Sequence, residues 1–269
     1  MSQTDTVFTG SIPALYDRYL RPLLFEPYAE DLAARLTNLR QGRVLEIAAG
    51  TGIVTRKLVS TLPQAVEIIA TDLNQPMLDF AATQPGTERA TWRQADAMSL
   101  PFEDEGFDAV VCQFGVMFFP DKNVAYREAH RVLKPGGRFI FSVWDRLEQN
   151  ELSQIINDAV AVCFPDDPPG FLARTPHGYH AVDTIRGELT TAGFSSVEIE
   201  TVRRSSRAAS PRDAVIGLCQ GSPLRNEIEA RDPDRLDAAT DAAAIAVAAR
   251  FGLGPISAQM QAHVITATA

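Results

Sequence analysis

The sequence is poor in residues that mark several large classes of protein. Its three cysteines among 269 residues, Cys112, Cys163 and Cys219, are odd in number and far apart. This pattern excludes a disulfide framework or a Cys-x-x-Cys metal site and is typical of a reducing compartment. The strongest apolar run, residues 242–249, is too short to cross a bilayer, and the N-terminus shows no signal-peptide pattern. We therefore expect a cytoplasmic protein that does not associate with a membrane.

The chain also has fewer positively charged residues than negatively charged ones. The chain has 25 Lys and Arg against 34 Asp and Glu, which gives a formal net charge of −9. Binding to nucleic acid requires a positive surface that displaces counterions from phosphates, so we expect no nucleic-acid partner. Hydrophobic residues make up 45% of the chain and charged residues 22%, which is typical of a globular protein and excludes general disorder.

Between residues 43 and 144, short apolar runs alternate with amphipathic helical patterns. The predicted strands are residues 43–47, 66–70, 91–94, 107–113 and 138–144, and a further strand follows at 197–202. This alternation predicts β-α-β units, and therefore an α/β fold with a doubly wound, mainly parallel sheet. Helix is predicted over residues 12–39, interrupted near Pro22 and Pro27, and residues 135–137 are predicted to end the helix before the fifth strand.

Two segments depart from this alternation of strand and helix patterns, and we interpret them as insertions into a single domain. The predicted organisation is an N-terminal helical arm (1–40), a core (41–144), a first insertion (145–180), a return to the core (181–204), a helical cap (205–253) and a final strand (254–269). The last segment alternates polar and apolar residues, which favours an antiparallel strand.

The turn after the first strand carries two glycines but not the motifs that bind phosphates. Gly50 and Gly52 lie where a parallel strand meets a helix, and glycine there lets the backbone approach a ligand closely. The third glycine of a dinucleotide fingerprint is replaced by Thr55, and no Gly-Lys-Ser/Thr follows. A pyrophosphate site is therefore disfavoured.

Acidic residues follow the next two strands. Asp72, about 20 residues after the turn, is placed to accept hydrogen bonds from both hydroxyls of a ribose; the alternative is a cap for the next helix, which Asn74 can supply. Asp96 is placed to accept from an adenine amine or, alternatively, is a turn residue. Met77 and Met98 would pack on the ring, unless they are core residues.

These features together indicate an adenosine site, and residues 43–144 resemble a class I S-adenosylmethionine-dependent methyltransferase of the small-molecule (methyltransferase type 11-like) branch. The motifs that carry the resemblance are VLEIAAGTG (44–52), ATDLNQPML (70–78), ADAMSLPF (95–102), FDAVVCQFGVMFF (107–119) and EAHRVLKPGGRF (128–139). The resemblance implies a Rossmann-like sheet of seven strands, six parallel and the last antiparallel.

The resemblance also implies a cofactor site for S-adenosylmethionine as the methyl donor. Its glycine turn would pass beneath the methionine and ribose parts, Glu46 would orient the turn and the amino group, and the residues after the fourth strand would face the methyl group. The implied set is Glu46, Ala48, Gly50, Gly52, Asp72, Leu73, Met77, Asp96, Ala97, Met98, Gln113, Phe114 and, from the arm, Tyr16, with Tyr19 and Arg21 as neighbours; ordinary helix packing is the alternative for these three.

A general base is required only if the acceptor must lose a proton. His177 and His180 are the candidates, with Asp166 or Asp167 nearby; the alternative is that all are exposed loop residues. A metal site at His177-x-x-His180 lacks a third ligand, so none is expected.

The acceptor is expected to be a small organic molecule, apolar or aromatic. Aromatic and apolar residues lie near the predicted site: Phe114, Met117, Phe118, Trp144, Phe164, Phe171 and Tyr179. Two alternatives to a methyltransferase are a nicotinamide-dependent oxidoreductase on a similar sheet and a non-catalytic adenosyl-binding module.

Overall fold

A computed structural model describes residues 10–269, and the chain divides into two compact units. The core unit comprises Tyr28–Val143, His180–Val202 and Ala262–Ala269. The helical unit comprises the described part of Met1–Pro27 together with Trp144–Tyr179 and Arg203–Gln261. The helical unit thus contains most of the first insertion and of the helical cap expected from the sequence.

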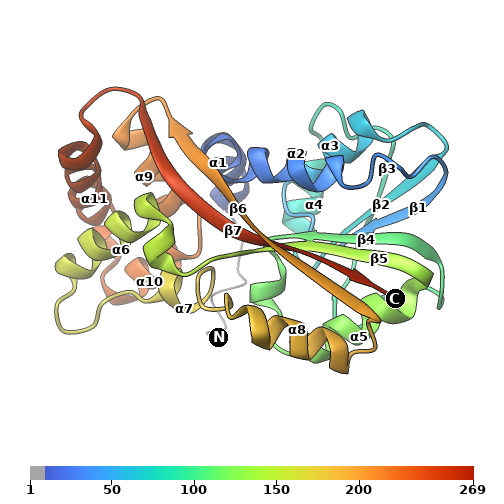
Figure 1. The fold of residues 1–269 in the computed structure, drawn as a ribbon. Coiled ribbons are helices and arrows are strands. Elements are labelled where there is room, and N and C mark those ends of the chain that lie inside the picture. The colour runs from blue at the N-terminus through green and yellow to red at the C-terminus, as the bar shows by residue number, and fades with distance from the viewer. Residues whose placement is uncertain (1–9) are drawn as a thin grey trace. The chain divides into compact units, whose positions relative to one another are not determined.

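A seven-stranded sheet organises the core unit, and its long last strands continue into segments of the helical unit (Figure 1). The strand order is β3-β2-β1-β4-β5-β7-β6. The strands are β1 (Gly42–Glu46), β2 (Val66–Asp72), β3 (Ala90–Gln94), β4 (Phe107–Gln113), β5 (Leu133–Trp144), β6 (Ser196–Ala208) and β7 (Ile256–Thr268). β1 pairs in parallel with β2 and β4, β2 with β3, and β4 with β5, which confirms the doubly wound sheet.

β7 runs against its neighbours, as the alternating pattern of the final segment predicted. The Gly136 N–H donates to the Ala269 carbonyl, whereas nine residues further along the Asp145 N–H donates to the Gln261 carbonyl. β6 shows the same relation, since the Ser195 N–H donates to the Thr268 carbonyl. The sheet is therefore six parallel strands and one antiparallel strand.

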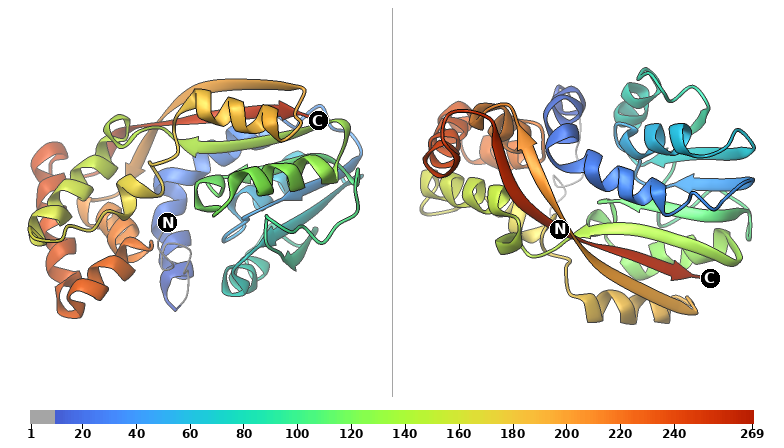
Figure 2. Two further views of the ribbon diagram at one scale, coloured as in Figure 1. Left: turned by 90° about the horizontal axis from the view of Figure 1, so that it is seen from below. Right: turned by 45° about the horizontal axis from the view of Figure 1, so that its top comes forward.

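Helices cover both faces of the sheet within the core unit. They are α2 (Glu26–Ala34), α3 (Ile53–Thr61), α4 (Gln75–Ala82), the single turn η3 (Val116–Phe118), α5 (Lys122–Val132) and α8 (Val182–Thr191). α3 lies on one face, and α5 and α8 lie side by side on the other (Figures 1 and 2). β4 and β5 are buried on both faces, which explains their nearly continuous apolar sequences.

The helical unit is built from short helices around α11. Its elements are α1 (Ile12–Leu15), η2 (Tyr16–Phe25), η4 (Leu147–Gln149), α6 (Glu151–Cys163), α7 (Phe171–Arg174), α9 (Pro211–Gln220), α10 (Leu224–Arg231), η5 (Pro233–Arg235) and α11 (Leu236–Phe251). α11 packs along α6 and α9. Its residues Thr240, Ala243 and Val247 are buried. Within residues 10–269, no helix has the length and apolarity that crossing a membrane requires.

The prediction that prolines interrupt the arm was wrong. Helical structure is continuous from Ile12 to Ala34, because η2 is a π-helix that contains Pro22, and Pro27 lies in the first turn of α2. Proline in an α-helix lacks one N–H and crowds the carbonyl four residues earlier. The wider π turn, closed by the Glu26 N–H donating to the Arg21 carbonyl, accommodates it.

The Pro-Gly-Gly segment is part of β5, not a break before it. α5 already ends at Val132, and β5 starts at Leu133, five residues earlier than predicted. Leu133 pairs with Phe107 and Arg138 with Ala109, so residues 134–137 form a bulge in the ladder. β7 stabilises this bulge, since Gly136 and Gly137 exchange backbone hydrogen bonds with Ala269.

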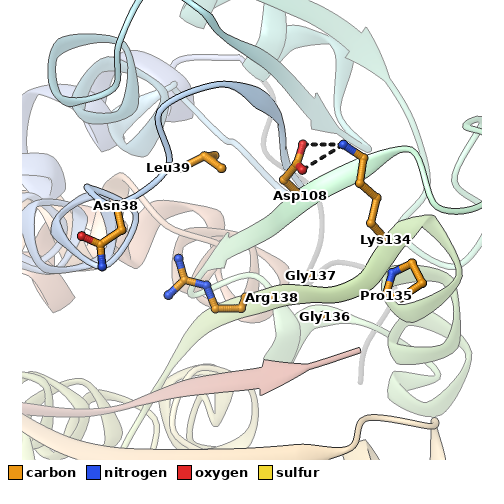
Figure 3. Close-up of a pocket in the computed structure, with 8 residues that line it drawn as sticks. All are labelled: Asn38, Leu39, Asp108, Lys134, Pro135, Gly136, Gly137 and Arg138. Carbon is orange, nitrogen blue, oxygen red and sulfur yellow. Dashed lines mark hydrogen bonds and ion pairs between the residues drawn. The ribbon is translucent and has the colours of Figure 1, made fainter.

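Asp108 connects the starts of three neighbouring strands at the amino edge of the sheet. Its carboxylate accepts from the Arg43 N–H (2.8 Å) and from Lys134 Nζ (2.8 Å to each oxygen). Burial opposes ionisation of Asp108, but these hydrogen bonds outweigh it and lower its pKa. A pocket of about 310 Å³ opens here, lined by Asn38, Leu39, Asp108, Lys134, Pro135, Gly136, Gly137 and Arg138 (Figure 3).

Gly42 is required for this contact, and substitution tests it. Its φ is +116°, and a Cβ built there collides with the Asp108 carboxylate. We expect Gly42→Ala to lower the free energy of unfolding by about 2 kcal/mol or more. Gly187→Ala is the matched control, because Gly187 is exposed within α8 with open space around it. The control should stabilise by about 0.5–1 kcal/mol. Urea denaturation measures both changes; equal effects would contradict this role of Gly42.

Candidate functional site

The turn after β1 is held at the carboxyl edge of the sheet by both neighbouring strands. The Ile47 N–H donates to the Val111 carbonyl of β4, and the Ala49 N–H donates to the Thr71 carbonyl of β2 (both 2.9 Å). Between them Ala48 has φ +55°, a left-handed conformation that is uncommon for a residue with a Cβ. The turn is therefore a strained segment fixed by the ladder on either side, as is common at functional sites.

Asp72 organises this edge through its carboxylate. Its Oδ2 accepts from the Gly50 N–H (2.8 Å), and its Oδ1 accepts from the Asn74 N–H (2.8 Å). The side chain is 7% exposed. Burial raises its pKa, and the hydrogen bonds from Asn74 and Gly50 partly oppose that rise. Each oxygen keeps lone-pair capacity, so Asp72 is able to accept further hydrogen bonds from a ligand.

Asn74 occupies the N-cap position of α4, but its side chain makes no capping bond to that helix. Its Nδ2 lies 3.5 Å from Asp72 Oδ1 instead. The turn between β2 and α4 is therefore built around the Asp72 carboxylate, and Asn74 does not supply the side-chain cap that the sequence suggested.

Glu46 ends β1 and is fully buried. Its Oε2 accepts from the Thr55 hydroxyl (2.6 Å), and its backbone carbonyl accepts from the Thr71 hydroxyl (2.9 Å). Burial raises the pKa of Glu46 to about 8; the nearby Asp72 charge adds to the rise, and the Thr55 hydrogen bond opposes it. Glu46 is therefore mainly protonated at neutral pH, and a cation close to it would favour its ionised form.

The two glycines of the turn serve different purposes. A Cβ at Gly50, where φ is +56°, would meet no atom within 4 Å, so this part of the backbone faces open space. A Cβ at Gly52, where φ is +76°, would stand 2.9 Å from the Trp92 ring and 3.2 Å from Ala81. Gly52 thus allows close packing of α3, whereas Gly50 leaves the turn accessible to a ligand.

The residues after β2 and β3 stand next to one another. The Ala95 N–H donates to the Asp72 carbonyl (3.0 Å), which holds the end of β3 beside the end of β2. Asp96 is half-buried, and its Oδ1 accepts from the Met98 N–H (2.9 Å), so it forms the turn that the sequence left as an alternative. Its Oδ2 remains to accept from a ligand. Met77 and Ala97 are buried, whereas Leu73 is 52% exposed.

The end of β4 closely approaches the first turn. Phe114 has φ +52°, donates its N–H to the Ser142 carbonyl (3.0 Å), and packs edge-on against Tyr28. A Cβ at Gly115 would stand 2.5 Å from the Ala48 Cβ. Glycine is therefore required where the loops after β1 and β4 meet. Gln113 directly precedes this contact.

The remaining predicted residues belong to different units. Tyr16, Tyr19, Arg21 and His177 are in the helical unit, whereas His180 is in the core unit. His177 is 4% exposed, so the alternative that it is an exposed loop residue is wrong. Asp166 and Asp167 are exposed, and Asp167 pairs with Arg231. Among residues 10–269, no three His, Cys, Asp or Glu side chains are grouped as a metal site requires.

Sequence reasoning missed two residues that build the site. In the sequence, Thr55 was noted only because it replaces the third glycine of a dinucleotide fingerprint. In the structure it is fully buried, and its hydroxyl donates to the Glu46 carboxyl group. Gly115 was not predicted as a site residue, because the close contact that requires glycine there is made by Ala48, 67 positions away in the chain. The position of a hydroxyl side chain one helical turn after the glycines could have indicated the role of Thr55. No feature of the sequence indicated the role of Gly115.

The chain is similar to known proteins in sequence and in fold. Residues 45–141 match a family model described as a methyltransferase domain. The chain is 32% identical over 171 residues to the ubiquinone/menaquinone biosynthesis C-methyltransferase UbiE of Pectobacterium atrosepticum, a match that covers 59% of this chain and 68% of that protein.

Solved structures share the fold. The YcgJ protein of Bacillus subtilis is 22% identical with a TM-score of 0.57, covering 90% of this chain and 98% of that one. The phosphoethanolamine N-methyltransferase 2 of Haemonchus contortus, solved in complex with S-adenosyl-L-methionine, is 16% identical with a TM-score of 0.62, covering 100% of this chain and 60% of that one.

The raised pKa of Glu46 predicts how stability depends on pH. In the unfolded chain Glu46 ionises near the ordinary glutamate pKa of 4.5, but in the folded protein burial raises its pKa to about 8. Ionisation therefore favours the unfolded state over that interval, and Glu46 removes up to about 1.4 kcal/mol of stability per pH unit as pH rises. We expect Glu46→Gln, which keeps an acceptor for Thr55, to remove this part of the slope.

Urea denaturation at several pH values between 5 and 8 measures the slope. The advantage of Glu46→Gln over wild type should grow with pH. Glu103→Gln is the control, because Glu103 is exposed, and it should follow the wild-type slope. A constant difference between Glu46→Gln and wild type would contradict a protonated Glu46.

Proposed function

The chain belongs to the class I S-adenosylmethionine-dependent methyltransferases, and from that membership we propose how its residues hold the methyl donor and what acceptor they serve. The protein transfers a methyl group from S-adenosylmethionine to a small-molecule acceptor. The observation that carries the residue assignment is the buried Asp72 carboxylate bound to the Gly50 N–H, beside a turn that faces open space.

We assign the ribose to Asp72. A carboxylate fixed by two backbone N–H groups needs no rearrangement to accept from two neighbouring hydroxyls. The open side of Gly50 supports a ligand lying against the backbone of the turn, and Ala48 and Gly52 shape that turn. The site fits an adenosyl group without phosphates, since Asp72 and Glu46 are both acidic.

Glu46 would act on the methionine end of the donor. Its carboxyl lies beneath the turn, bound to Thr55, so it acts through the turn or through water. A cationic amino group favours the ionised form of Glu46, and binding would then be coupled to release of a proton.

The adenine end is assigned to the loop after β3. Asp96 Oδ2 would accept from the exocyclic amine, and the Ala97 N–H would donate to the ring. Met98 and the exposed Leu73 supply apolar contact, with buried Met77 behind them. These assignments extend the resemblance residue by residue to atoms that keep hydrogen-bonding capacity in the structure.

Gln113 and Phe114 are assigned to the reacting end. The bound donor supplies a methyl group on a sulfonium whose positive charge is lost on transfer. The contribution of the protein is alignment, which supplies roughly 7–11 kcal/mol in well-ordered cases. The strained backbone at Phe114 is suited to that task, because it cannot shift without breaking the hydrogen bond from its N–H to the Ser142 carbonyl.

We propose an apolar or aromatic acceptor. The similar Pectobacterium protein is a C-methyltransferase of ubiquinone and menaquinone biosynthesis, which supports this class. Apolar side chains after β4 support it too, since Phe114, Met117 and Phe118 belong to the core unit, whereas the other residues expected near the acceptor belong to the helical unit: Trp144, Phe164, Phe171 and Tyr179. The cytoplasmic location and the absence of a nucleic-acid partner stay predictions.

The two alternatives to a methyltransferase are not favoured. A nicotinamide site would require a glycine where buried Thr55 binds Glu46. A non-catalytic adenosyl-binding module would use the same carboxylates, and it is not favoured because the similar Pectobacterium protein is a C-methyltransferase.

Asp72→Asn tests the ribose assignment. The amide turns one acceptor into a donor, which meets the N–H of either Gly50 or Asn74 and weakens ribose binding. We expect the Kd of S-adenosylhomocysteine to rise about 10- to 100-fold, equivalent to roughly 1.4–2.7 kcal/mol. Isothermal titration calorimetry measures the change. Asp79→Asn on α4 is the matched control, since Asp79 is exposed and accepts from Gln75 Nε2 in the same helix. A Kd within threefold of wild type for Asp72→Asn would refute the assignment.

A further inference from the structure

The pocket at the amino edge of the sheet is separate from the proposed donor site. All of its lining residues lie within the core unit. The proposed donor site is formed by loops that follow strands, at the carboxyl edge, whereas Asp108 and Lys134 lie at the starts of β4 and β5. With a volume of about 310 Å³, the pocket has the size of a site for a small organic molecule.

The charges that line this pocket are unequal. Lys134 and Arg138 are cationic, and Asp108 is the one acidic residue among the lining residues. Lys134 Nζ donates to both oxygens of Asp108 (2.8 Å each), and the Arg43 N–H donates to Oδ2 (2.8 Å). The charge of Asp108 is thereby compensated, so the positive charge of Arg138 has no counterpart in the lining. This excess is local, since the whole chain has a net charge of −9.

The donors of this pocket are available to a ligand. The Arg138 guanidinium is half-buried and, within residues 10–269, makes no hydrogen bond or ion pair. Figure 3 shows Arg138 and Asn38 on one side of the pocket and the pair of Lys134 and Asp108 on the other. A guanidinium presents two parallel N–H groups that match the oxygens of a carboxylate. The Asn38 amide and the third N–H of the Lys134 ammonium are further donors.

The same groups exclude other classes of ligand. A cation would be repelled by Arg138 and would have to displace Lys134 from Asp108. A phosphate ester carries close to two negative charges at neutral pH, which is more than the single uncompensated positive charge balances. Leu39 and Pro135 make part of the wall apolar. The lining therefore matches one negative charge on a planar group that is attached to a small apolar body.

We propose that this pocket binds a small organic monocarboxylate. Its carboxylate pairs with the Arg138 guanidinium and accepts from Asn38 and Lys134, and its apolar body lies against Leu39 and Pro135. A ligand in this position contacts the bulge at residues 134–137 of β5. It therefore stabilises the folded protein by mass action and does not compete with the methyl donor.

Three probes of one shape and different charge test the proposal. Benzoate is an anion, benzamide is neutral and benzamidine is a cation. Inorganic phosphate is the fourth probe, which distinguishes a carboxylate site from a site for any oxyanion. Each is titrated at constant ionic strength while NMR follows the backbone amides of Gly136 and Gly137, which line the pocket, so that the Kd is assigned to this site.

Two variants change the charge of the pocket. Arg138→Gln removes the uncompensated charge and the guanidinium. Asn38→Asp adds a negative charge at an exposed side chain that makes no hydrogen bond within the described part of the chain, so it tests the site even if Arg138→Gln does not fold. Arg127→Gln is the matched control, because Arg127 is exposed on α5 and does not line the pocket.

We expect benzoate to bind saturably and about tenfold or more tightly than benzamide, as a charge-assisted pair of hydrogen bonds implies, and benzamidine not to bind at this site. Arg138→Gln and Asn38→Asp should each raise the Kd of benzoate about tenfold or more. Arg127→Gln should match wild type. Saturating S-adenosylhomocysteine should leave the Kd of benzoate unchanged, because the donor site lies at the opposite edge of the sheet.

The absence of a saturable benzoate shift at Gly136 and Gly137 would overturn the proposal, as would equal binding of benzamide or benzamidine, or tighter binding of phosphate. An unchanged Kd of benzoate in either folded variant, or displacement of benzoate by S-adenosylhomocysteine, would also overturn it. A protein that binds benzoate here but does not bind S-adenosylhomocysteine would contradict only the proposed function, so the two failures are distinguishable.

Discussion

The hydrogen bond from the Gly50 N–H to the Asp72 carboxylate is the contact on which the site depends. It joins the turns after two neighbouring parallel strands through a buried, charge-bearing acceptor. The same carboxylate holds the Asn74 N–H at the start of α4. One side chain thus sets the shape of two loops.

A second buried acid, Glu46, lies beneath the same turn, and the charge of Asp72 accounts for only part of the rise in its pKa. Desolvation is the larger cause for Glu46, with the repulsion from Asp72 and the Thr55 hydrogen bond acting in opposite directions. Burying two carboxylates destabilises the fold, and for Glu46 the nearby Arg56 charge offsets this only in part. Left-handed backbone at Ala48 and Phe114 adds strain to the same edge. Destabilising features that are concentrated at one edge of an otherwise regular sheet are characteristic of a functional site.

Much of this was accessible from the sequence because it depends on local pattern. Apolar runs of strand length alternating with helical spacing predicted the sheet, and the alternation in the final segment predicted antiparallel β7. The acids at 46, 72 and 96 follow strands, so their common edge was predictable from the rule that parallel strands end together. Two predictions were wrong because they used local residue preferences alone. A π-helix accommodates Pro22, so the arm is not interrupted there, and hydrogen bonds to β7 make the Pro-Gly-Gly segment part of β5.

By itself, the sequence determined the fold class, the family and the residues at the strand ends, because each depends on residue type and spacing along the chain. Only the tertiary structure decided which contacts and hydrogen bonds these residues make within the protein. It showed Thr55 beneath Glu46, Gly115 against Ala48, and Lys134 bound to Asp108. Those pairs lie 9, 67 and 26 positions apart. Protonation follows from burial and hydrogen-bond partners, and contacts at such separations leave no periodic trace in the chain.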